Sequence, residues 1–214
     1  MLNINKLFLA CCVVLFSLVS GIENNLTAAN ALDIVEFTNG FSLSQAEKNS
    51  LQQGKVVLKG QKGKYLGQVV TKGDLETAWQ VLTDYNNFQN FLPNIASSKI
   101  ISNSANKVVF EQINVVDLWL LKQEFKVKIA ADKNKPNNQI TFQIIDGDLK
   151  KLRGAWTIET TPTGQVLVKH LVEVEPGSNT EKPFFYGVYE SSLEDTLQAI
   201  AQEISRRDQQ ANLN

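Results

Sequence analysis

Residues Pro183 to Arg207 read PFFYGVYESSLEDTLQAIAQEISRR, and this stretch decides the fold. Its apolar positions recur at steps of three and four residues, which places them on one stripe of an α-helix. They are Phe185, Tyr189, Leu193, Leu197, Ile200 and Ile204. Pro183 suits a first helical position, and Arg207 lies at the end where cations favour the helix dipole. An amphipathic helix of about seven turns needs a large apolar surface to pack on.

The preceding residues predict such a surface in the form of an antiparallel sheet. Short apolar segments separated by short polar turns indicate seven strands: 65–71, 95–102, 107–115, 123–131, 139–145, 151–160 and 165–175. Apolar and polar residues alternate along the later strands, as where Phe125 and Val127 flank Lys126. One apolar and one charged face is typical of a half-buried antiparallel sheet. Two short helices, Leu75–Thr83 and a second one ending before Pro93, are expected after the first strand.

The alternation also predicts the register of the last hairpin. A three-residue loop, Pro162 to Gly164, keeps the apolar residues of both strands on one face, because a slip of one residue would reverse the faces. The expected cross-strand pairs are Arg153 with Glu173, Lys151 with Glu175, and Trp156 with His170. The first two combine opposite charges on the wet face, which supports the register.

Composition and the N-terminal residues limit the class of protein. The 214 residues are 43% hydrophobic and 20% charged, with a net charge of −1. No basic block is present, so the sequence does not indicate a nucleic-acid partner. Lys6, the apolar run Leu7–Val19 and the small residues before Leu32 predict a secretory signal over residues 1–31, cleaved after Ala31. A periplasmic or lumenal protein is then expected, with an uncleaved N-terminal membrane anchor as the alternative.

The same pattern predicts the organisation of the remainder. Residues 32–62 are expected to form an N-terminal extension, 63–207 the folded domain and 208–214 a disordered tail. Both cysteines, Cys11 and Cys12, lie within the predicted signal. A mature chain without them has neither a thiolate nucleophile nor a cysteine metal site.

Few residues carry recognisable chemistry. His170 is the only histidine and is predicted to point inward. A catalytic or metal role would need partners that the sequence does not place beside it, so the wall of a cavity is the favoured position. Asp146 and Asp148 flank Gly147 and are expected to form a solvated turn. The apolar stretch Val115–Leu121 predicts a tip whose Trp119 covers a cavity mouth or touches a membrane. The alternative is two strands that run longer, with these side chains packed under the helix.

The pattern as a whole resembles the START-like, helix-grip superfamily, and within it the polyketide cyclase/dehydrase and coenzyme Q-binding families. The matching segments are Trp79–Tyr85 with Phe91–Pro93, Gly147–Trp156, and the closing helix, within residues 63–207. The resemblance implies an α+β fold in which a curved seven-stranded antiparallel sheet surrounds a long C-terminal helix. It also implies an apolar cavity between sheet and helix that holds a lipid, an isoprenoid quinone or a polyketide-like molecule. Many members carry an aromatic residue where His170 stands.

Three functions remain open from the sequence. The first is a carrier of a lipid or quinone, with possible transient membrane contact through Leu118, Trp119 and Leu120 and no cofactor or metal. The second is a cyclase or dehydratase that uses His170 with Tyr189 or an aspartate. The third is an assembly or scaffold protein whose cavity is filled by its own side chains. Candidate ligand-binding residues are Trp79, Phe91, Trp119, Phe125, Phe142, Trp156, His170, Phe185 and Tyr189. The cavity is expected under the aromatic first half of the last helix, with closed core packing under its second half.

Overall fold

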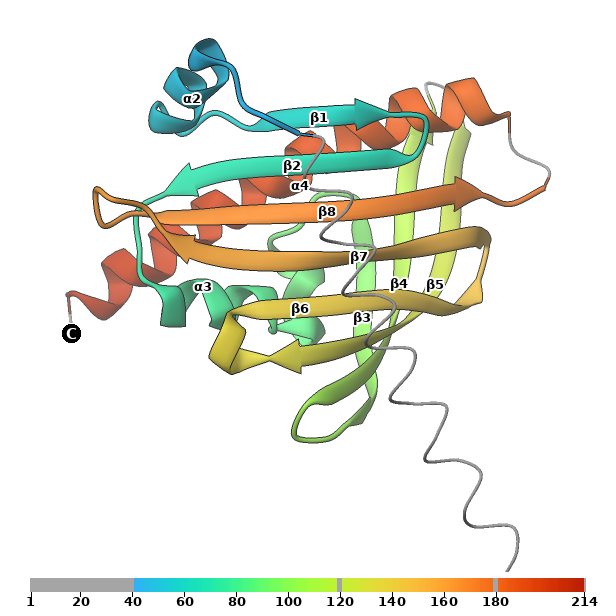
Figure 1. Cartoon of the computed structure of the whole chain (residues 1–214). Coiled ribbons are helices and arrows are strands. Elements are labelled where there is room, and N and C mark those ends of the chain that lie inside the picture. Colours follow the sequence, from blue (N-terminus) through green and yellow to red (C-terminus); the bar gives the residue numbers. More distant parts are fainter. Residues whose placement is uncertain (1–40, 119–120, 179–180, 214) are drawn as a thin grey trace, which may run out of the picture. The chain divides into compact units, whose positions relative to one another are not determined.

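The structure, a computed structural model, describes residues 41–118, 121–178 and 181–213 (Figure 1). The helices are α2 (Gln45–Gln52), α3 (Leu75–Leu82), α4 (Lys182–Ala211) and the 3₁₀ turns η1 (Tyr85–Asn90) and η2 (Lys135–Asn137). The strands are β1 (Val57–Gln61), β2 (Lys64–Thr71), β3 (Ile95–Asn103), β4 (Lys107–Leu118), β5 (Leu121–Asn134), β6 (Gln139–Gly147), β7 (Leu149–Thr160) and β8 (Val166–Pro176).

The strands form one antiparallel sheet of eight, in the order β1-β2-β8-β7-β6-β5-β4-β3. The α+β class and the closing helix agree with the sequence prediction, but the predicted number of strands, seven, is one too low. The additional strand is β1, which pairs with β2 from Val57 opposite Gln68 to Gln61 opposite Lys64. The predicted boundary between residues 62 and 63 therefore falls inside a β-hairpin, and β1 belongs to the sheet.

The predicted register of the last hairpin is confirmed. Trp156 pairs with His170, Arg153 with Glu173 and Lys151 with Glu175. The Nε of Arg153 donates to Glu173 Oε2 at 2.7 Å. The ammonium of Lys151, however, lies 2.8 Å from Glu173 and not beside Glu175.

Helix α4 lies across the apolar face of the sheet, and its buried residues include Phe185, Leu193 and Leu197 (Figure 1). Gly67 on β2 allows this close approach, because a Cβ at that position would lie 2.2 Å from Cδ1 of Leu197. The helix continues to Ala211. Residues 208–211, predicted to belong to a disordered tail, are thus helical, since the polar residues after Arg207 continue the helix beyond its apolar stripe.

Ion pairs connect the C-terminal part of α4 to the segment between α3 and η1. The carboxylate of Glu203, only 8% exposed, accepts from the guanidinium groups of Arg206 and Arg207 at 2.7 Å each. Arg207 also donates to Asp84 Oδ2 at 2.7 Å. The buried carboxylate and the two elements are therefore held by the same guanidinium.

Strand β3 forms one edge of the sheet. Its pairing with β4 shifts register between Ile95 and Ser97 and again between Ile100 and Ser102. The backbone N–H of Ile100 donates to the side-chain amide oxygen of Asn86 on η1 at 2.8 Å.

The β4–β5 hairpin is longer than predicted. Pairing extends to Leu118 opposite Leu121, so the prediction that the strands run longer is the one that the backbone supports. Trp119 and Leu120 lie outside the described residues, as does the predicted signal at residues 1–31. Among the described helices, none is long and apolar enough to cross a membrane.

Candidate functional site: an apolar cavity under the C-terminal helix

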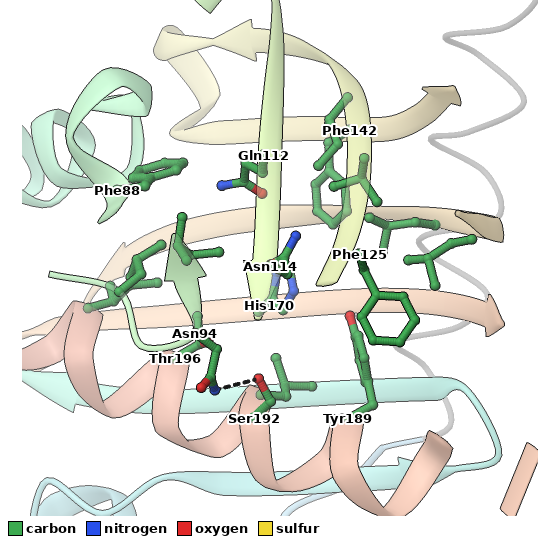
Figure 2. A pocket seen from close by; sticks show the side chains of 18 of the residues that line it. Phe88, Asn94, Gln112, Asn114, Phe125, Phe142, His170, Tyr189, Ser192 and Thr196 are labelled. Carbon is green, nitrogen blue, oxygen red and sulfur yellow. Dashed lines mark hydrogen bonds between the residues drawn. The ribbon is translucent and has the colours of Figure 1, made fainter. Parts of the chain in front are cut away.

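A cavity of about 270 Å³ lies between the apolar face of the sheet and α4. Its walls come from α3, η1, the strands β3 to β8 and α4, so residues far apart in sequence meet there (Figure 2). Along α4 the lining begins at Phe184 and ends at Ile200. The cavity therefore extends further along the helix than the aromatic first half predicted, while Leu197 and Ile204 are fully buried in the core.

Six predicted binding residues line the cavity: Phe125, Phe142, Trp156, His170, Phe185 and Tyr189. The strand residues among them share the inward parity of the sheet, which the alternation had indicated. Phe185 and Tyr189 come from the first turns of α4, and their rings stack with centroids 5.7 Å apart.

Two other predicted residues do not line the cavity. Trp79 is buried in the core, with the ammonium of Lys135 5.0 Å from its ring centroid; Val81 and Leu82 of the same helix line the cavity. Phe91 lies with its ring 5.4 Å from the guanidinium carbon of Arg207. Helical periodicity identified the apolar side of these segments but not which of its residues reach the cavity. Trp119, the predicted entrance residue, lies outside the described residues.

His170 lies among aromatic rings. Its ring centroid is 3.6 Å from that of Trp156 and 5.5 Å from that of Phe142, stacked in both cases. Nδ1 is buried without a hydrogen-bond partner among the described residues. Burial lowers the pKa of the imidazole from 6.5 to about 3. The ring is therefore neutral at physiological pH and behaves largely as an aromatic residue of the wall.

Two tyrosines of the cavity wall are also kept neutral. Burial raises the pKa of both Tyr85 and Tyr189 above the ordinary value of 10. The hydroxyl of Tyr85 is buried without a hydrogen-bond partner among the described residues. Neither phenol is joined to His170 by a hydrogen bond, so the described residues contain no imidazole–phenol acid–base pair.

One side of the cavity carries amides and hydroxyls that the sequence prediction missed. The members of this polar cluster are Asn94, Gln112, Asn114, Ser192 and Thr196 (Figure 2). Gln112 and Asn114 are alternate residues of β4, and Ser192 and Thr196 are one turn apart on α4. Asn94 donates weakly to Ser192, at 3.4 Å. The inward parity of Phe110, two residues before Gln112, was the signal that could have identified the two amides on β4.

No aspartate, glutamate, lysine or arginine side chain lines the cavity among the described residues. Asp148, at the turn predicted to be solvated, accepts the backbone N–H of Lys126 at 2.7 Å. Asp146 pairs with Lys128 at 3.4 Å. Within the described residues no group of three or more histidine, cysteine, aspartate or glutamate side chains could hold a metal ion.

Comparison with solved structures supports the same architecture. The STAR-related lipid transfer protein of Xanthomonas axonopodis is 17% identical, with a TM-score of 0.55 over 70% of this chain and 92% of that one. The Zhui aromatase/cyclase of Streptomyces sp. R1128 is 15% identical, with a TM-score of 0.54 over 66% and 93%. A START superfamily protein of Mycobacterium smegmatis is 16% identical, with a TM-score of 0.53 over 74% and 99%. At these identities the likeness concerns the fold alone.

Sequence comparison identifies the family. No curated protein matches the chain. The family described as polyketide cyclase / dehydrase and lipid transport matches residues 72–201, more than half of the 214 residues. That segment runs from just before α3 to the buried part of α4 and supplies most of the cavity wall. The chain belongs to the polyketide cyclase / dehydrase and lipid transport family.

Proposed function

We propose that the protein binds and carries a hydrophobic small molecule, such as a lipid or a quinone, in the cavity under α4. The observation that carries the proposal is an apolar cavity walled by aromatic rings and by one polar cluster, an arrangement typical of small-molecule sites. The family description, which includes lipid transport, supports it. A volume of about 270 Å³ is just below the roughly 300–1,000 Å³ of such sites. The enclosed part of the ligand is therefore compact, and a long chain would extend beyond it.

The cyclase or dehydratase alternative has less support. That chemistry needs a group that exchanges a proton near neutral pH. With a pKa of about 3, the imidazole of His170 is a weak general base. It is hydrogen-bonded to no titratable side chain among the described residues. These properties favour a carrier over an enzyme.

The proposal includes export and a transient encounter with a membrane. Its support is the sequence pattern of residues 1–31 and the apolar tip at Leu118, Trp119 and Leu120. The intact mass of the protein purified from its own host tests the first point. A chain that begins at Leu32 is expected in the soluble fraction. Recovery of a membrane-bound chain that retains residues 1–31 would contradict cleavage and show that the carrier is anchored to the membrane.

A pair of alanines on β5 gives a matched test of binding. Ala131 is 2% exposed and lines the cavity, whereas Ala130 points to the opposite face. Ala131→Phe should fill part of the cavity and weaken binding of the neutral probe N-phenyl-1-naphthylamine by about tenfold, the equivalent of roughly 1.4 kcal/mol. Ala130→Phe should leave the affinity near that of the unmodified protein.

Fluorescence titration measures both affinities, and thermal unfolding verifies that the variants are folded. Equal probe binding by all three proteins would place the probe outside the cavity and contradict the proposal. Native mass spectrometry of the protein from its own host supplies a second readout. A co-purifying apolar molecule that is reduced in Ala131→Phe would support the carrier function.

A further inference from the structure

The walls of the cavity discriminate by charge. Among the described lining residues none is an aspartate, glutamate, lysine or arginine, and His170 is neutral because of its burial. An ionised group inside such a cavity would lose its hydration without gaining an opposite charge. This is one of the most unfavourable transfers in protein chemistry.

The same walls favour a neutral polar group at one place. Gln112 is 9% exposed, and its side-chain amide forms no hydrogen bond with another described residue. Asn114, two residues further along β4, is half-buried, and its side chain likewise forms no hydrogen bond with another described residue. Both amides face the cavity and have no partner within the described part of the protein, so a ligand group that accepts or donates a hydrogen bond there gains more than an apolar group would.

The remaining members of the polar cluster complete this position. Asn94 directly precedes Ile95, and Ile95 pairs with Asn114. The backbone carbonyl of Asn94 accepts a hydrogen bond from the backbone N–H of Val115 at 2.8 Å. Ser192 and Thr196 present hydroxyls from successive turns of α4. Phe142, Trp156 and His170 on β6, β7 and β8 form an aromatic part of the wall. The cavity thus combines aromatic walls with a neutral polar cluster.

We propose that the part of the ligand inside the cavity is uncharged, with an apolar body against the aromatic wall and one hydroxyl or carbonyl group at the polar cluster. A carboxylate, a phosphate or an ammonium group is excluded from the cavity and, if the ligand has one, remains outside. This inference rests on the proposed carrier function and defines the class of ligand that the carrier accepts.

Ten-carbon amphiphiles that differ only in the head group test the inference. Displacement of N-phenyl-1-naphthylamine is measured with 1-decanol, decanoate and decylammonium at pH 7.5, below their micellar concentrations. Decanol should displace the probe at a concentration at least about tenfold lower than either ion, because neither ion has a counter-charge in the cavity. Equal potency of decanoate or decylammonium would overturn the proposal.

Two substitutions at one position separate head-group recognition from general hydrophobicity. Gln112→Leu keeps the size of the side chain and removes the amide. It should lower the affinity for decanol by about five- to tenfold. Gln112→Lys should increase decanoate binding relative to decanol and leave decylammonium weak. Unchanged selectivity in both folded variants would overturn the assignment of the polar cluster. Asn114→Leu serves the same purpose if Gln112→Leu does not fold.

The experiments distinguish a failure of the carrier function from a failure of the proposed ligand class. If the probe does not bind, or binds Ala131→Phe unchanged, the carrier function fails and the ligand class fails with it. If the probe binds and Ala131→Phe weakens it, but decanol and decanoate are equally effective, only the ligand class is wrong.

Discussion

Trp156 and His170 face each other across β7 and β8 with their ring centroids 3.6 Å apart and their planes inclined by 23°. The contact places the only histidine of the chain in an aromatic stack at the wall of the cavity. The histidine therefore contributes a flat, neutral surface to the site.

Replacement of the two rings should affect binding unequally. Trp156→Ala removes the larger of the two rings from the cavity wall. It should lower the affinity for N-phenyl-1-naphthylamine by about tenfold, equivalent to roughly 1.4 kcal/mol of binding free energy. His170→Phe keeps a ring in the stack and should alter the affinity less than about threefold. Trp79→Phe, outside the cavity lining, is the matched control. Abolished binding or turnover in a folded His170→Phe would instead support the enzyme alternative.

The buried imidazole predicts a pH dependence of stability. Its pKa is about 3 in the folded protein against 6.5 without burial, so between these values the unfolded chain binds a proton that the folded chain does not. The contribution of the neutral His170 to the free energy of unfolding is therefore complete above pH 6.5 and declines as the pH falls below it. In urea unfolding, the unmodified protein should lose about 2 kcal/mol more than His170→Phe between pH 7 and pH 5. Parallel losses would show that the histidine is protonated in the fold.

The contact between Gly67 and Leu197 predicts a compensating pair of substitutions. A Cβ at Gly67 would lie 2.2 Å from Leu197 Cδ1, so Gly67→Ala should force α4 from the sheet and cost about 1–3 kcal/mol. Leu197→Ala alone leaves a cavity and costs about 2–5 kcal/mol. The double variant should be more stable than the sum of the two losses predicts, because the new methyl occupies vacated space. Additive losses in urea unfolding would contradict the close contact.

The carboxylate of Glu203 should be a strong determinant of stability. Hydrogen bonds from Arg206 and Arg207 hold the pKa of this carboxyl below its usual 4.5, so it stabilises the fold above that pH and the contribution declines as the carboxyl is protonated. Glu203→Ala leaves Arg207 with Asp84 as its remaining ionic partner and should cost about 2–3 kcal/mol at pH 7. Glu194→Ala, at an exposed position of the same helix, should change stability by less than about 0.5 kcal/mol. A similar effect of both would show that the ion pairs contribute little.

Alternation made much of this fold predictable. In β7 and β8 most inward positions are apolar, and this parity together with the three-residue loop Pro162 to Gly164 predicts the register that brings Trp156 opposite His170. The sequence predicts a short strand at Val56 to Leu58, but places it in the N-terminal extension and outside the sheet. Only the pairing with β2, a tertiary contact, shows that the segment belongs to the sheet.

The site was less predictable than the fold. Parity and helical period identify which side of an element is apolar, and they correctly turned Phe125 and Phe142 inward. They do not distinguish a residue that fills the core, such as Trp79, from one that borders a cavity. The inward parity of Phe110 also places Gln112 on the apolar face, but parity does not show that an inward amide borders a cavity.

The edge strand β3 has a consequence for behaviour at high concentration. An uncovered strand with regularly spaced N–H and C=O groups is a template on which a second molecule can add its own strand and begin aggregation. Here two register shifts interrupt that spacing, and Asn86 occupies the backbone N–H of Ile100. These features protect the β3 edge against strand addition, and Asn86→Ala is the substitution expected to expose this edge and promote self-association.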